Sequence, residues 1–176
     1  MKKLALIALA LFAANAEARD SIRFDLSLQS LNTYARQGAN SYEMRHSQGS
    51  MSGNLSASIG GRSASQAIPA TQQSGEAKGR LDVLSPTLIR MVGADGNSVD
   101  VKARVNADGS IYAEGRHLAR AVRAMIAPQL AAIQQQLEGK GQVSIDIRAR
   151  DLSCAPKADG LVCSMAASIS LSAVQY

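Results

Sequence analysis

The sequence predicts an α+β fold, in which an antiparallel sheet of about four to six strands packs on one long helix. Three observations lead to this prediction. Several segments alternate apolar and polar residues, one segment repeats apolar residues every three or four positions, and the only two cysteines flank a short polar turn. Alternation is typical of strands with one buried face, and the longer repeat is typical of an amphipathic helix. The dry faces of the strands and the apolar stripe of the helix can then cover each other.

Residues 1–18 have the pattern of a signal peptide, which we expect to be cleaved and therefore absent from the folded domain. Two lysines precede an apolar run over 4–14, and Ala16-Glu17-Ala18 supplies the small residues that signal peptidase recognises. A membrane anchor is the alternative, but it needs about 20 apolar residues. We therefore expect a bacterial exported protein with a single domain over 19–176, located in the periplasm or, alternatively, outside the cell.

Composition narrows the classes of partner. Loss of residues 1–18 removes Lys2, Lys3 and Glu17, so the net charge falls from +5 to +4. A mild positive charge permits contact with anionic lipid or polysaccharide without requiring it. Tryptophan is absent and aromatic residues make up 3% of the chain, which disfavours stacking on bases. We therefore expect no nucleic-acid partner.

The first segment after the signal peptide predicts a strand. Apolar residues alternate with polar ones from Ile22 to Leu28, as in a half-buried strand. The spacing of Leu28, Leu31, Tyr34 and Ala35 also fits a helical turn, so strand and helix both remain open for residues 20–35.

Residues 47–79 are rich in Ser, Gly, Ala and Gln. Few large apolar side chains are present to offset the entropic cost of ordering this segment. We expect mainly a long flexible loop, with a weak strand through Leu55, Ala57 and Ile59 as the alternative.

Short strands are expected between residues 80 and 113. A buried strand fits 88–92, and two alternating runs at 99–105 and 111–113 flank a turn containing Asp108-Gly109. Two alternating runs joined by Asp-Gly predict a β-hairpin.

The long helix is expected at about 116–138. Its apolar stripe comprises Leu118, Val122, Ile126, Leu130, Ile133 and Leu137. Gly139 and Gly141 are suitable for ending the helix. Pro128 lies inside the pattern and removes a backbone donor, so we expect it to kink or split the helix.

The C-terminal region predicts a disulfide-closed hairpin. Alternating runs at 143–149 and 163–171 suit antiparallel strands, and Cys154 and Cys163 flank a turn-forming segment. Facing positions on two strands bring cysteines within bonding reach, and an exported protein meets oxidising conditions. A redox site would need Cys-x-x-Cys, and a metal site would need further ligands at suitable spacing. The sequence therefore predicts a structural disulfide.

Catalytic patterns are missing from the sequence. Gly49-Ser50-Met51-Ser52-Gly53 resembles a nucleophile elbow but has methionine where the serine nucleophile belongs. The only histidines, His46 and His117, lie in no recognisable ligand or catalytic pattern. We therefore expect neither an enzyme nor a metal or other cofactor.

Three arginines are the candidate binding residues. Arg116, Arg120 and Arg123 are spaced by four and three positions, which places them along one side of the helix. Such a stripe suits anionic lipid, polysaccharide or an acidic partner, and an ordinary solvated helix face is the alternative.

The functional hypothesis is a non-enzymatic exported protein that binds another envelope component, first of all a protein. The alternative is a carrier of a lipid or other apolar ligand held between sheet and helix. A hydrolase of envelope polymers is the third possibility. The oligomeric state is not predicted.

Overall fold

The computed structural model describes residues 20–137 and 139–175, so the predicted signal peptide lies outside the described residues. Strands make up 66% of the described residues and helix 14%. The strands are β1 (Ser21–Arg36), β2 (Ser41–Ile59), β3 (Arg62–Glu76), β4 (Arg80–Ser85), β5 (Leu88–Val92), β6 (Ser98–Lys102), β7 (Arg104–Val105), β8 (Ile111–Ala113), β9 (Gly141–Ala149), β10 (Leu152–Lys157) and β11 (Gly160–Gln175). The helix is α2 (Gly115–Gln136).

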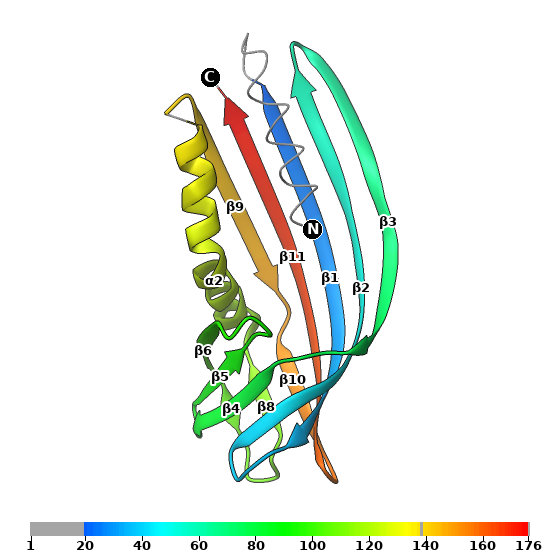
Figure 1. The fold of residues 1–176 in the computed structure, drawn as a ribbon, viewed down its shortest axis with the longest axis vertical. Coiled ribbons are helices and arrows are strands. Elements are labelled where there is room, and N and C mark those ends of the chain that lie inside the picture. Colours follow the sequence, from blue (N-terminus) through cyan, green and yellow to red (C-terminus); the bar gives the residue numbers. More distant parts are fainter. Residues whose placement is uncertain (1–19, 138, 176) are drawn as a thin grey trace.

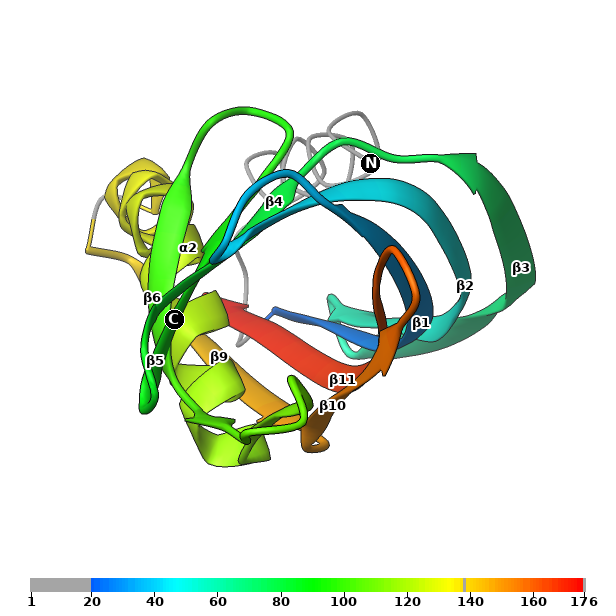
Figure 2. The same cartoon turned by 90° about the horizontal axis from the view of Figure 1, so that it is seen from below.

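All of these strands belong to one antiparallel sheet. Its main path runs β6-β5-β4-β2-β1-β11-β10-β8-β7, while β3 pairs with β2 and β9 pairs with β11. The sheet is strongly curved and nearly closed, as the view along its long axis shows (Figure 2). The predicted α+β fold with about four to six strands on a helix is therefore wrong. The fold is mainly β, because long strands wrap around the interior and α2 borders one side of it (Figure 1).

Strand β1 lies at the centre of the sheet and settles the question left open for residues 20–35. It pairs with β11 from Ser21 to Ala35 and with β2 along its full length. Both partners are long, so hydrogen bonding on two sides favours the strand over the helical turn that the spacing of its leucines also allows.

Residues 47–79 form regular structure where mainly a loop was expected, and the alternative strand through Leu55, Ala57 and Ile59 is part of β2. They run through most of β2 and all of β3, and Gly60 and Gly61 form the turn between the two strands with φ of 57° and 75°. Positive φ at both positions is typical of the tight turns that join strands in hairpins. Backbone pairing with β1 on one side and β3 on the other orders this part of β2 without large side chains, which composition alone could not reveal.

Helix α2 begins at Gly115, and Pro128 lies within it without splitting it. A Cβ atom on Gly115 would lie 1.9 Å from the carbonyl oxygen of Ala149, so only glycine permits this close approach to the end of β9. The Gly115 amide donates to a carboxylate oxygen of Asp151 at 2.8 Å, which satisfies one of the free donors at the helix start.

The predicted hairpins are partly found. Strands β7 and β8 join through the Asp-Gly turn, but β6 pairs with β5 and not with the strand that follows it. Cys154 and Cys163 face each other on β10 and β11 and form a disulfide, which confirms that prediction.

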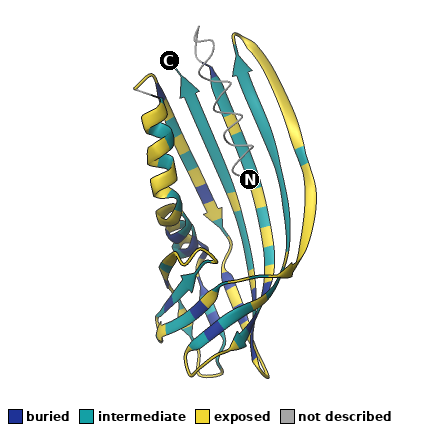
Figure 3. Cartoon of the chain, viewed as in Figure 1, coloured by how far each residue is buried: buried dark blue, intermediate teal, exposed yellow. Residues whose placement is uncertain are grey.

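The packed core lies at one end of the sheet, where β4–β8 and β10 meet the start of α2. We call this the closed end; the open end is the remainder, where β1, β2, β9 and β11 continue toward Ile22. Buried residues gather mainly at the closed end (Figure 3). The core contains Tyr34, Tyr42, Leu81, Ile89, Val101, Ile111, Ala113, Leu118, Ala121, Leu152, Cys154, Leu161 and Cys163.

Candidate ligand groove

The apolar side chains of the long strands share one face of the sheet. This inner face also carries the core and faces α2. Rows of facing residues cross β11, β1 and β2: Ala173 with Ile22 and Ala57, Leu171 with Phe24 and Leu55, Ile169 with Leu26 and Gly53, and Ala167 with Leu28 and Met51. Strand β9 extends these rows with Val143, Ile145, Ile147 and Ala149. The result is a continuous apolar floor from the core to the open end.

Most of this floor is only half-buried. Ile22, Phe24, Leu26 and Leu28 on β1 all keep partial exposure, whereas Ile147 on β9 is buried. Fully burying a side chain of this size stabilises by about 1.5–3 kcal/mol. An extended apolar face that forgoes this stabilisation is typical of a surface that binds something.

Helix α2 forms one wall of the groove. It packs beside β9 and reaches β6, but only Gly115, Leu118 and Ala121 in its first two turns are buried. The later apolar residues of its stripe remain half-buried, including Val122 and Ile126. The helix is thus anchored at the closed end and leaves its apolar side along the open end available.

A cavity of about 650 Å³ occupies the junction of the groove with the core. Its apolar lining includes Leu28, Met51, Ala149, Met165, Ala167 and Ile169 from the sheet and Leu118 and Val122 from α2. Small-molecule sites have volumes of about 300–1,000 Å³ and are mostly apolar with a few polar groups. This cavity meets both conditions.

Polar residues of β1, β2 and β3 also line the cavity, and two of them, Ser30 and Ser47, belong to a hydrogen-bonded group next to the core. The Ser47 hydroxyl donates to the Asn32 side-chain carbonyl at 2.6 Å, and the Asn32 amide donates to the Ser30 hydroxyl at 3.3 Å. Ser30 and Ser47 line the cavity, while Asn32 is 4% exposed and lies behind them. We call these three residues the hydroxyl cluster. It places two oriented hydroxyls at the inner end of an apolar groove.

The opposite, outer face of the sheet is polar. On β1, the Arg23 guanidinium donates to the Asp25 carboxylate at 2.9 Å and holds the pKa of that carboxyl below its ordinary value, helped by the hydroxyl of Ser170. On β9, Arg148 pairs with Asp146 at 3.0 Å. Charge pairs and serines along these strands are typical of a solvated face.

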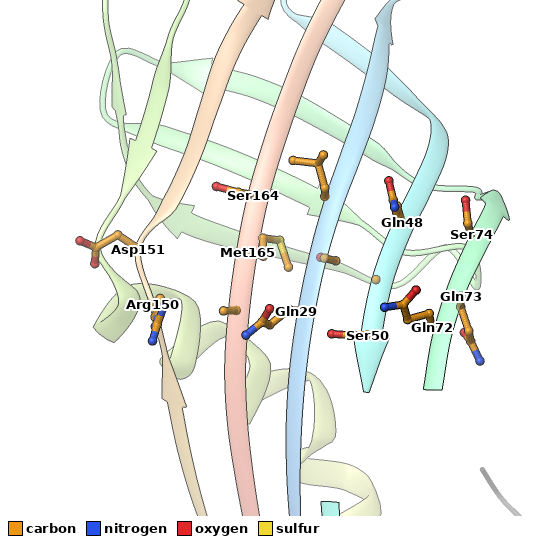
Figure 4. A pocket seen from close by; sticks show the side chains of 14 residues that line it. Gln29, Gln48, Ser50, Gln72, Gln73, Ser74, Arg150, Asp151, Ser164 and Met165 are labelled. Carbon is orange, nitrogen blue, oxygen red and sulfur yellow. The ribbon is translucent and has the colours of Figure 1, made fainter. Parts of the chain in front are cut away.

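A hollow of about 520 Å³ lies on this outer face. Its polar lining includes Gln29, Gln48, Ser50, Gln72, Ser74, Arg150, Asp151 and Ser164. Figure 4 shows these side chains spread over β11, β1, β2, β3 and the segment after β9, without converging on one point. The hollow therefore lacks the convergent polar groups that fix a ligand's orientation.

The three predicted arginines do not line the cavity. Arg116 pairs with Glu114 at 2.7 Å, and Arg123 donates to the carbonyl of Ile145 at 2.8 Å. Arg120 is exposed on α2. Two of the three are thus engaged within the chain, and their binding of an anionic partner stays a prediction.

The histidines and acidic residues form no metal centre in the described part of the chain. His46 contacts the Ser74 hydroxyl at 3.0 Å, and His117 is half-buried near the start of α2. Within residues 20–137 and 139–175, no group of three or more His, Cys, Asp or Glu side chains is arranged to hold a metal ion.

The sequence contained part of the signal for the groove. Alternation from Ile22 to Leu28 marks one dry strand face, but Ser47 and Met51 lie in the segment expected to be a loop. Their position beside β1 follows from the register of β2, which no local pattern shows.

No protein-family model, curated protein or solved structure matches this chain. In the described residues, no helix has the length and apolar character needed to span a membrane.

Proposed function

We propose that this protein is an exported, non-enzymatic binding protein that carries a lipid-like ligand in the groove between its sheet and α2. The observation that carries the proposal is the continuous, half-buried apolar floor leading into a cavity. The envelope component expected from the sequence is then a small amphiphile, and the carrier alternative is favoured over a protein partner.

The dimensions of the floor suit one acyl chain. Leu28 lies six positions after Ile22, which corresponds to about 20 Å along a strand at about 3.3 Å per residue. One leaflet of a bilayer has a hydrocarbon depth of about 15 Å, half of the whole core. Each CH₂ group transferred from water to the groove contributes about 0.8 kcal/mol before the entropic costs of binding are subtracted. A single chain can therefore supply most of the affinity.

A protein partner remains the second candidate because β3 has a free edge. Within the described sheet β3 pairs only with β2, and nearly all of its residues are exposed. No charged side chain lies between Arg62 and Glu76. Such an edge can accept an added strand. However, Pro69 and the shifted pairing beside it interrupt the strand at its middle, as in edges that resist pairing.

Enzymatic activity has less support from the described side chains. Among them, every carboxyl group with a clearly shifted pKa, such as Asp25 and Asp82, has that pKa lowered. A hydrolase of envelope polymers would use a general acid with a raised pKa beside a second carboxylate.

The test is ligand binding by the full chain, expressed with its own leader, purified from the cell envelope and stripped of lipid by organic solvent. We expect it to bind a fluorescent fatty-acyl probe, and Leu26→Asp to weaken binding at least about tenfold because a charge would lie on the apolar floor. Ser27→Asp is the matched control, since Ser27 is an exposed residue of the same strand on the outer face. Folded protein that binds no apolar probe would refute the proposal.

A further inference from the structure

We infer that the groove selects an amphiphile with an uncharged, hydroxyl-bearing polar end, inserted with that end toward the core and held by Ser30 and Ser47. This inference rests on the proposed function, because it specifies the ligand class of the same groove.

The hydrogen bonds of the hydroxyl cluster leave one donor and one acceptor for a ligand. Ser47 gives its proton to Asn32, so its oxygen can still accept; Ser30 receives the Asn32 amide, so its own proton can still be donated. Asn32 is buried toward the closed end and is hydrogen-bonded to both hydroxyls. A ligand hydroxyl both donates and accepts, so it can bond to both serines at once.

The charge of the cavity argues against an ionic headgroup. Of its described lining residues only Glu76 is charged, and neither lysine nor arginine is among them. A carboxylate or phosphate at the hydroxyl cluster would lose hydration without gaining a cation, which is costly in apolar surroundings. Arg116 and Arg123 are bound elsewhere and lie outside the lining.

The direction of insertion follows from the distribution of polar and apolar rows. Ser30 and Asn32 are the polar residues of β1 on the inner face, and they adjoin the core. From Leu28 to Ile22 the inner face of β1 is apolar at every position. A tail can therefore extend only toward the open end if the polar end reaches the serines.

The inference is tested with three probes that share one tail: dodecanol, dodecanoate and dodecyltrimethylammonium. Each probe displaces the fluorescent acyl probe from the full, delipidated chain at about pH 8, where a carboxyl group is ionised. We expect dodecanol to bind at least about tenfold more tightly than either charged probe. Equal affinities for all three would overturn the inference while leaving the carrier function intact, whereas failure of all three to bind would refute both.

Single substitutions test whether Ser30 and Ser47 form hydrogen bonds with the ligand. Ser30→Ala and Ser47→Ala are each expected to weaken dodecanol binding about threefold to tenfold, the effect of one neutral hydrogen bond, and to leave the two charged probes unchanged. Ser27→Ala on the outer face is the control and should change nothing. Equal weakening of all three probes would indicate a distorted groove and overturn the assignment, as would unchanged dodecanol binding.

Discussion

The closed and open ends of the same sheet use the same strands in opposite ways. Strands β1, β2 and β11 run through both ends, and their inner face is mainly apolar on either side of the hydroxyl cluster. At the closed end that face meets β4–β8, β10 and the start of α2, and its large side chains are buried. At the open end the same pattern remains half-buried (Figure 3). Alternation thus specifies which side of a strand is dry, and the covering elements decide whether that side becomes a core or a binding surface.

Truncation of one leucine at each end should show how differently the two ends are packed. Leu81→Ala removes a side chain with 0% exposure from the core, and we expect the free energy of unfolding to fall by about 2–5 kcal/mol. Leu26→Ala removes a half-buried side chain from the groove floor, where we expect a loss below about 1.5 kcal/mol. Urea unfolding of the two variants measures both.

The same two variants should respond in the reverse order when ligand binding is measured. Leu26→Ala should weaken binding of the fluorescent acyl probe, while Leu81→Ala should leave binding unchanged below its unfolding transition. Equal losses of stability would mean that the open end is as well packed as the closed end, and the comparison would fail.

The stability of the closed end should fall at alkaline pH because of Tyr34. Burial raises the pKa of the Tyr34 hydroxyl to about 12, above the ordinary value of about 10. Because the pKa is higher in the folded state, the stability is fully present below about pH 10 and is lost as the pH rises toward 12. The loss amounts to about 2–3 kcal/mol at about 1.4 kcal/mol per pH unit.

Urea unfolding at several alkaline pH values measures this loss. Tyr34→Phe removes the titrating hydroxyl and should flatten the profile over that window, although other groups that titrate there will leave a residual slope. Unchanged pH dependence in Tyr34→Phe would show that the alkaline loss arises elsewhere. Acyl-probe binding in the variant should stay normal at neutral pH, since Tyr34 belongs to the core and not to the cavity lining.

The sequence predicted the elements with strong local patterns. The helix expected at about 116–138 is found at Gly115–Gln136, because its apolar repeat is long and regular. The Cys154–Cys163 pair is found because its turn segment brings two strand positions face to face. In both cases the deciding contacts are close in sequence.

Elements that depend on distant partners were missed. Strands β2 and β3 have the composition of a loop, and they are ordered by pairing with β1 and with each other. Strand β6 fits a hairpin with the next strand equally well, but it pairs with β5. The groove was foreseen only as an alternative, because no local pattern tells whether a dry strand face is covered.

Gly115→Ala, at the start of α2, should lower the free energy of unfolding by less than Leu81→Ala does. A methyl group at position 115 would meet the Ala149 carbonyl oxygen at 1.9 Å, so Gly115→Ala must shift the helix or the end of β9. Alanine favours helix by about 1 kcal/mol over glycine, yet we expect a net loss of about 1–3 kcal/mol from the clash. The control is Gly38→Ala, where the added atom would meet nothing within 4 Å.

The same substitution tests whether the closed end positions the wall of the groove. Helix α2 is buried only near Gly115, so a shift there should move Val122 and the later turns relative to β9. We therefore expect Gly115→Ala to weaken acyl-probe binding as well as stability, in unfolding and displacement assays on the same preparation. Lower stability with unchanged binding would mean that the groove keeps its shape without this anchor. The open end would then be a site that the long strands maintain by themselves.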